Sequence, residues 1–249
     1  MLLRRITQFL IIYALGIALL LGLKYVLGLS NYVIPGPVEI WATTETVFSR
    51  YWADTINTLT VAIVGQVISV ALALLVGIVG RQTTWFGSFV KVAAYNVQAY
   101  PIVALAPIIF ILLGDGLIPR LLIAAMICYF PLLLVVIGVM SEPVVDIEHF
   151  YRITGRMRWQ FEIKIRAFEN LSKLTTVVSG SATLAMAGTI VAEFIAANAG
   201  IGYSIRIALY QSDLAKILVA LFLIGISLSV YQGLLEWTGA AVKRRWTVT

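Results

Sequence analysis

Charged residues are scarce in this 249-residue chain. Only 12% of residues are charged whereas 61% are hydrophobic, and the mean hydropathy is +0.96. A water-soluble domain of this size needs far more polar surface to cover its core. Repeated apolar runs of about 20 residues are long enough to cross the hydrocarbon of a bilayer as helices, and they lack the strand alternation of a barrel. The sequence therefore predicts an all-helical, polytopic integral membrane protein.

Catalytic and metal-binding residue patterns are also lacking. The chain has one histidine and one cysteine, so neither a disulfide within the chain nor a Cys/His metal cluster is available. Cys128 lies inside an apolar run, where we expect a buried, inert thiol. No phosphate-binding glycine loop and no serine-nucleophile motif occurs. We expect no cofactor, no metal site and no enzymatic activity, so any ATP hydrolysis would reside in a partner.

Six membrane spans can be placed along the chain, at about 6–28, 56–80, 89–113, 118–141, 174–197 and 215–241. The first fits an uncleaved transmembrane helix better than a secretory signal, because its apolar run is too long for a signal peptide. Between the first two spans, Pro35 and Pro37 end the first helix. Val38, Trp41 and Phe48 then predict a short interfacial helix. All 249 residues form one membrane domain.

The formal net charge of +6 does not indicate a nucleic-acid partner, because the basic residues are spread between apolar spans. The positive-inside rule explains them if both termini are cytoplasmic. Five basic residues then fall on or near the outer side: Lys24, Arg50, Arg120, Arg206 and Lys216. The other thirteen of the eighteen are inside: Arg4, Arg5, Arg81, Lys91, Arg152, Arg156, Arg158, Lys164, Arg166, Lys173, Lys243, Arg244 and Arg245.

The cytoplasmic loop 146–168 contains the basic stretch "YRITGRMRWQFEIKIRAF" from Tyr151 to Phe168. Apolar residues recur in it at a spacing of four, at Ile153, Met157, Phe161 and Ile165, which predicts an amphipathic helix. Its other face carries charged residues: Arg152, Arg156, Arg158, Glu162 and Arg166. Such a helix either lies on anionic membrane lipid or docks into a groove of a soluble partner, and composition alone leaves both open.

The same loop resembles the coupling loop of permease subunits of bacterial ABC importers. That family pattern is E-A-A-x-x-x-G, nine residues, then I-x-L-P. Gly155 matches the glycine, "RWQF" from Arg158 resembles the usual continuation, and Ile165 falls at the apolar position. His149-Phe150-Tyr151 replaces Glu-Ala-Ala, and Ala167-Phe168 replaces Leu-Pro. The resemblance implies ATPase coupling by Arg152, Gly155, Met157, Arg158, Trp159, Phe161 and Ile165.

Three further segments are similar to the branch of these importers that transports nitrate, taurine, alkanesulfonates, bicarbonate and thiamine precursors. They are "IPGPVEIW" from Ile34, "YPIVALAPIIFILLGDG" from Tyr100 and "TIVAEFIAANAGIGYSI" from Thr189. The resemblance covers nearly the whole chain. It implies a type I importer permease in the bacterial inner membrane, forming half of a homodimer or heterodimer. Its expected partners are ATPase subunits, a second permease and a periplasmic or lipid-anchored solute-binding protein.

Candidate residues of a translocation path are Glu193, Pro101 and Pro107. A carboxylate inside a span is costly, so Glu193 is a functional-site candidate by default. The alternatives are helix packing with hydrogen bonds to Ser or Thr neighbours, or a position close enough to the interface to stay solvated. The two prolines predict a kink or an interruption in the third span. The small residues of "SGSATLAMAG" from Ser179 predict close helix packing. The leading function is ATP-driven import of a small anionic or polar solute, and the alternative is a permease-derived membrane scaffold.

The thirteen-to-five distribution of basic residues generates a prediction on topology. Single cysteines at Thr43 and Arg158, introduced in a Cys128→Ser background, should be labelled by an impermeant thiol reagent from opposite sides of the membrane. Labelling of both cysteines from one side would contradict the six-span topology.

Overall fold

The computed structural model describes residues 2–80, 84–99, 102–141 and 159–247, and all of its regular elements are helices. They are α1 (Leu2–Leu27), α2 (Pro37–Gly80), α3 (Thr84–Ala99), α4 (Ile102–Leu113), α5 (Leu117–Ser141), α7 (Trp159–Glu169), α8 (Leu171–Ile195), α9 (Ile201–Tyr210) and α10 (Leu214–Thr247). In this described part, α1, α2, α5, α8 and α10 are long and apolar enough to cross a membrane. The prediction of an all-helical membrane protein is confirmed.

The predicted third span, 89–113, contains two described helices, because α3 ends at Ala99 and α4 begins at Ile102. The sequence predicted a kink or an interruption of this span at its prolines. Pro101 lies outside the described residues, so its part in the interruption stays a prediction. Pro107 lies inside α4 without ending it.

The predicted short interfacial helix after Pro37 was wrong. Pro37 is the first residue of α2, and the helix then continues without a break for 44 residues to Gly80. A proline suits the first helical position, since its missing N–H has no partner there. The interfacial segment and the second span are therefore one element.

The centre of the bundle is formed by α2, α5 and α8, which pack closely against one another. Their buried apolar residues include Ala73, Leu132 and Met186. Cys128 is buried among them, as expected, with a free thiol. Most of the "SGSATLAMAG" residues are buried, and a side chain at Gly188 would meet Ala124 Cα at 3.2 Å. The predicted close packing of this small-residue segment is confirmed.

A polar network ties the centre of the bundle to α10. Gln66 of α2 donates from Nε2 to the Val178 carbonyl at 2.7 Å and to Ser181 Oγ at 2.9 Å, and Tyr231 of α10 donates to Gln66 Oε1 at 2.6 Å. Polar groups in an apolar interior need such partners. The buried amide therefore fixes the relative positions of α2, α8 and α10.

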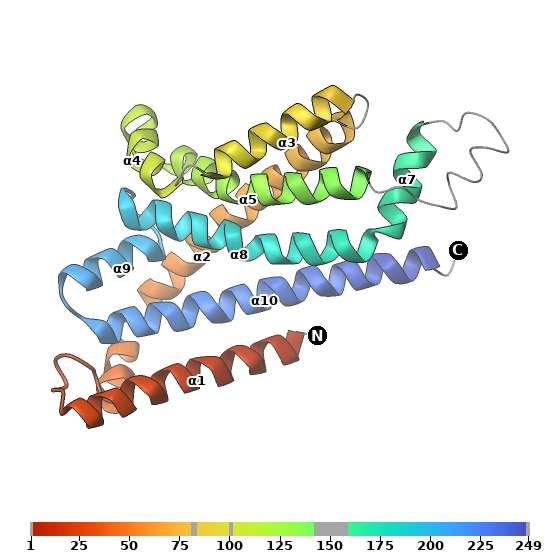
Figure 1. Cartoon of the computed structure of the whole chain (residues 1–249). Coiled ribbons are helices and arrows are strands. Elements are labelled where there is room, and N and C mark those ends of the chain that lie inside the picture. The colour runs from red at the N-terminus through yellow and green to blue at the C-terminus, as the bar shows by residue number, and fades with distance from the viewer. Residues whose placement is uncertain (1, 81–83, 100–101, 142–158, 248–249) are drawn as a thin grey trace.

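The first helix, α1, lies along α10 (Figure 1). Phe9 and Tyr13 contact Phe222 through their rings, and the Tyr13 hydroxyl donates to the Leu218 carbonyl at 3.1 Å. Even so, no residue of α1 is buried in the single chain. Most of this apolar helix is therefore left for membrane lipid or another subunit to cover.

The two ends of the bundle differ in the elements they carry. In Figure 1, α7 lies across the ends of α5 and α8, on the same side as the C-terminus, whereas α4 and α9 lie at the opposite side. The N-terminal part of α1 reaches the C-terminal half of α10, where Arg5 forms an ion pair with Glu236. The two termini thus lie toward the same end as α7.

Candidate functional site: a buried arginine–glutamate pair

Glu193 lies in the last turn of α8, which ends at Ile195. Its side chain is completely buried (0% exposed). An unpaired carboxylate in such a position costs many times the stability gained from one ordinary contact, so its partners decide whether the fold is possible. Its two oxygens bind groups from three other helices.

Arg120 supplies the positive charge. It follows Pro119 in the first turn of α5, and its guanidinium Nη2 forms an ion pair with Glu193 Oε1. The same Nη2 donates to Asn57 Oδ1 of α2 at 2.7 Å. Arg120 itself is only 5% exposed. The pair is therefore a buried salt bridge between α5 and α8, oriented by an amide from α2.

The second carboxylate oxygen binds α2 and α9. Thr58 Oγ1 donates to Glu193 Oε2 at 2.7 Å, and the Gly202 backbone N–H donates to it at 3.0 Å. The Ile201 N–H in turn donates to Thr58 Oγ1 at 2.9 Å. First-turn N–H groups of a helix have no partner within the helix and carry a partial positive charge. Glu193 and Thr58 satisfy two of them at the start of α9. We call Asn57, Thr58, Arg120, Glu193 and Gly202 the Glu193 cluster.

Two glycines, Gly200 just before α9 and Gly202 in its first turn, make this approach possible. Gly200 has φ +94°, a backbone conformation that other residues adopt only with strain, and a Cβ there would overlap the Glu193 carboxylate. A Cβ on Gly202 would meet the Ile190 carbonyl oxygen at 2.5 Å. The backbone can therefore come within hydrogen-bond distance of Glu193 only without side chains at these positions.

Arg206 fixes the same turn from α9. Its guanidinium donates to the carbonyls of Phe194 at 3.2 Å, Ile195 at 2.9 Å and Ala197 at 2.7 Å. These are the last carbonyls of α8 and the turn after it, which have no partner within the helix. A cation at a helix C-terminus is also favoured by the helix dipole. The end of α8 is thus held by Arg206 as well as by Glu193.

The chemistry of the Glu193 cluster is that of a helix junction. Among the described residues, no group of three His, Cys, Asp or Glu side chains could hold a metal ion. Replacing a buried ion pair by apolar groups is often tolerated, whereas removing one partner leaves an uncompensated charge. The cluster therefore specifies one arrangement of α2, α5, α8 and α9.

Of the other predicted path residues, Pro107 is exposed on α4, and Pro101 falls outside the described residues. Glu193 has both a hydroxyl partner, as in the packing alternative, and a buried arginine that sequence reasoning did not assign to it. That Glu193 faces a translocation path stays a prediction.

The predicted coupling residues lie on or before α7. Trp159 begins this helix and Phe161 lies in it, while Ile165 is half-buried. Arg152, Gly155, Met157 and Arg158 lie outside the described residues. ATPase coupling through these residues stays a prediction.

Arg166, which the sequence placed among the charged residues of the predicted amphipathic helix, is buried in the structure. It is 9% exposed, and its Nη1 donates to the carbonyl of Met140 at 3.3 Å. Met140 lies in the last turn of α5, where carbonyls lack partners within the helix and attract a cation. Arg166 therefore fixes α7 to α5.

Arg120 was missed as a site residue because it was assigned to the outer surface. The predicted topology could nevertheless have indicated this partner of Glu193. It places the C-terminal end of span 174–197 and the N-terminal end of span 118–141 on the same side, so Glu193 and Arg120 lie at the same depth. A buried carboxylate needs a cation, and Arg120 was available.

The fold and the site together define a multi-pass integral membrane protein whose spans are fastened by buried polar groups. Residues 69–247 match the family model described as the inner membrane component of binding-protein-dependent transport systems. The chain belongs to this family of ABC importer permeases. In these importers the membrane component is not itself an enzyme, and a separate subunit hydrolyses ATP.

Two relatives of this chain are named as transport permeases. A riboflavin transport system permease protein of Chloroflexus aurantiacus is 33% identical over 217 residues, which cover 84% of this chain and 80% of that protein. A formylaminopyrimidine transport permease protein of Halalkalibacterium halodurans is 22% identical over 200 residues, which cover 78% of each chain. These alignments support the importer permease class and do not point specifically to the nitrate and taurine branch.

The buried pair generates a prediction on stability. Arg120→Leu leaves Glu193 charged and unpaired, and should lower the free energy of unfolding by about 3–5 kcal/mol. Adding Glu193→Gln should recover much of this loss, because glutamine keeps an oxygen for the Thr58 hydroxyl and the Gly202 N–H. Thermal unfolding in detergent measures both.

Arg50→Leu is the matched control, because Arg50 forms an exposed pair with Asp54 at 3.9 Å. It should cost less than about 1 kcal/mol. An Arg120→Leu variant as stable as Arg50→Leu would contradict the structural role of the buried pair. In the same set, Glu193→Gln alone should change transport if the carboxylate faces the path, whereas normal transport by the folded variant would assign it to packing.

Proposed function

We propose that this chain forms half of the translocation path of an ATP-driven importer for a small heteroaromatic vitamin or its precursor. The observation that carries the proposal is the alignment with the riboflavin permease, at 33% identity over 84% of the chain. The formylaminopyrimidine permease, aligned over 78% of the chain, supports the same class of solute. Flavins and pyrimidines share flat, nitrogen-rich rings.

A small polar anion is the second candidate substrate. The motifs at Ile34, Tyr100 and Thr189 are similar to a branch of importers that transports nitrate, taurine, alkanesulfonates and bicarbonate as well as thiamine precursors. In such importers, selectivity rests largely with the solute-binding protein. The identity of the bound solute therefore distinguishes the two candidates.

The proposed orientation has both termini and α7 in the cytoplasm. Thirteen of the eighteen basic residues support it. The ion pair of Arg5 with Glu236, and the hydrogen bond of 3.0 Å from Lys243 Nζ to Ser172 Oγ, bring the two termini and the start of α8 to one end. The Glu193 cluster then lies toward the periplasmic side.

The proposed coupling runs from an ATPase through α7 into α8. α7 packs against α5 and α8, and only Asn170 separates it from α8. α8 is an uninterrupted helix of 25 residues, about 37 Å long, that carries Glu193 near its far end. A movement of α7 driven by ATP binding would thus reach the Glu193 cluster through one rigid element.

A second permease subunit, identical or different, would complete the path. The exposed apolar surface of α1 supports a further membrane partner, because no residue of that helix is buried in the single chain. A periplasmic or lipid-anchored solute-binding protein would deliver the solute on the outer side. Membrane lipid would cover the remaining apolar surface.

The proposal on coupling predicts which variants release the ATPase. Phe161→Asp places a charge on the apolar side of the proposed docking helix, and should abolish recovery of the ATPase in a pull-down from detergent, since an unpaired charge buried in an interface costs several kcal/mol. Arg156→Gln should be milder, because rim charges mainly affect association and its salt dependence.

Trp85→Asp is the control, because it makes the same kind of change at an exposed aromatic residue of α3. It should leave ATPase recovery unchanged. Full recovery with Phe161→Asp would show that this helix is not the coupling element. If the intact wild-type complex contained no nucleotide-binding subunit, the scaffold alternative would replace transport.

The substrate proposal predicts the response of the assembled importer. In lipid nanodiscs, with its binding protein present, ATP hydrolysis should rise several-fold with riboflavin or a formylaminopyrimidine and remain at the basal rate with nitrate or taurine. Stimulation by the anions alone would favour the second candidate. Normal ATPase recovery without stimulation by any of them would overturn both substrate classes and leave the permease class intact.

A further inference from the structure

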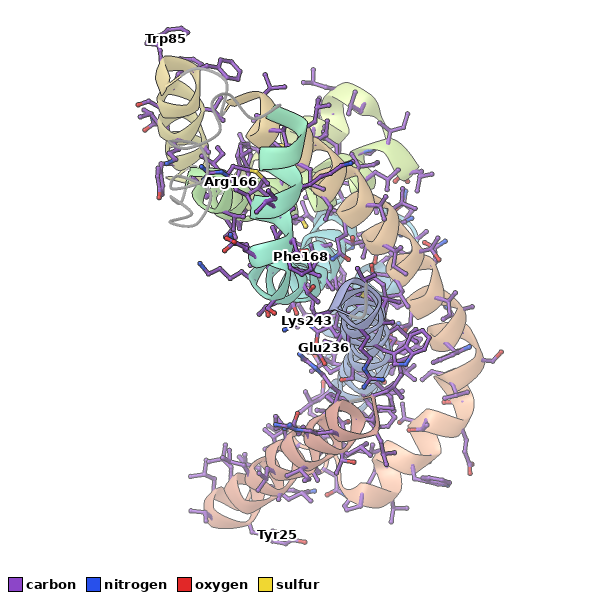
Figure 2. The ribbon with its side chains drawn as sticks, turned by 90° about the vertical axis from the view of Figure 1, so that its right-hand side faces the viewer. Tyr25, Trp85, Arg166, Phe168, Glu236 and Lys243 are labelled. Atoms are coloured by element: carbon purple, nitrogen blue, oxygen red, sulfur yellow. The ribbon has the colours of Figure 1, made fainter. Side chains whose placement is uncertain are left out.

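A polar groove of about 680 Å³ opens between α1, α8 and α10, at the end where the two termini lie. In Figure 2 the molecule is curved, and Lys243 and Glu236 of α10 lie on its concave side between α8 and α1. Most of the surrounding helix surface is apolar, as expected in a membrane. The groove is therefore a polar site within the membrane domain, well separated along α8 from the Glu193 cluster.

The charge of the groove is positive. Arg4, Arg5 and Lys243 line it, and Glu236 is the acidic residue among the lining residues. Glu236 forms an ion pair with Arg5, which also donates from Nη1 to Gln232 at 2.9 Å. The lining thus has an excess of two positive charges. Such a concentration of cations next to membrane helices attracts anions.

The α8 wall of the groove adds hydroxyl groups and a helix start. Ser172, Thr175 and Thr176 lie in the first turns of α8, which begins at Leu171. The first N–H groups of a helix carry partial positive charge. Lys243 Nζ donates to Ser172 Oγ at 3.0 Å, so a cation of α10 is held beside this helix start. Hydroxyls, a helix start and ammonium or guanidinium groups are the donors that bind phosphate oxygens.

Ser179 provides a second, independent observation, because its buried hydroxyl has no hydrogen-bond partner among the described residues. It lines the groove, it is 4% exposed, and its Oγ is buried without a hydrogen-bond partner among the described residues. The neighbouring Gln232 amide donates to Thr183 Oγ1 at 2.7 Å and to the Ser179 carbonyl at 3.4 Å instead. Buried hydroxyls nearly always have a partner, so this oxygen indicates a polar group that the chain itself does not supply.

We propose that this groove binds the headgroup phosphate of an anionic phospholipid. The groove lies between α1, α8 and α10 near the end of the bundle that carries the two termini, and a lipid bound there would keep its acyl chains against the apolar surface of α1. Basic grooves between membrane helices on the cytoplasmic side bind such headgroups. The bound lipid fastens α1 to α8, two helices that otherwise meet through α10. The site is independent of which solute the importer carries.

The test is lipid retention in native mass spectrometry of the purified complex, with phosphatidylglycerol and phosphatidylcholine supplied in equal amounts. The wild type should retain phosphatidylglycerol selectively. Arg4→Gln and Lys243→Gln, both at exposed positions, should each weaken retention about fivefold. Ser179→Ala should weaken it less. Lys91→Gln on α3 is the matched control, since it removes a cation of the same predicted side that does not line the groove.

Selective retention that falls in the groove variants, but not in Lys91→Gln, supports the proposal. Equal retention of both lipids, or equal loss in all charge variants, shows a non-specific attraction and overturns it. Release of the bound lipid by millimolar inorganic phosphate at constant ionic strength would show that the groove binds a free anion, and would also overturn it. Unchanged melting temperatures of the variants in lipid-free detergent exclude misfolding as a cause.

Discussion

The charge of Glu193 is the constraint on which this structure depends most directly. A carboxylate with no exposed surface, inside a helix that spans a membrane, is tolerable only if each of its oxygens has partners. Those partners are Arg120, Thr58 and the backbone of Gly202. They come from three different helices, so satisfying one side chain determines how α2, α5 and α9 meet α8. The two glycines of the adjacent turn follow from the same requirement, because side chains there would displace the carboxylate.

The polar groups of the bundle are placed at separate levels along α8. Arg166, just before α8, holds α7 to the end of α5. Gln66, which accepts from the Tyr231 hydroxyl, donates to Ser181 near the middle of α8, and the Glu193 cluster lies near its far end. Each of these hydrogen bonds has a preferred geometry. Two polar clusters therefore position α8 along its length, while Arg166 fixes the α7 helix that precedes it.

Much of the fold was predictable from the sequence because membrane spans are long and continuously apolar. The ends of α1, α5, α8 and α10 fall within several residues of the predicted spans. What composition did not indicate is where backbone breaks or continues. The prolines before Val38 suggested a separate short helix from there to Phe48, yet Pro37 starts the long helix α2. Hydropathy indicates which residues are apolar enough to lie in lipid, but it gives little information on where a helix begins or ends.

The candidate site was predictable only in part. Glu193 was identified because a carboxylate in a span is rare, but Arg120 was counted only as a charge on or near the outer side, since the positive-inside rule does not ask whether basic residues are paired. Arg166 was assigned only to the face opposite the apolar residues. Helical periodicity gives the faces of a helix, but it does not show that the end of a neighbouring helix will bury one of its arginines. The partners of these side chains come from segments far apart in the sequence, so they become evident only when the helices are packed together.

The unbroken length of α2 has a mechanical consequence. Its 44 residues extend about 66 Å, roughly twice the width of the hydrocarbon layer. Its first turns carry Glu39 and Glu45, which favour water over lipid. Since α2 runs from these first turns into its apolar part without a break, the two parts form one continuous helix. A protein that pressed sideways on the first turns would tilt the apolar part as well, so such a contact would be felt within the bundle without any local unfolding.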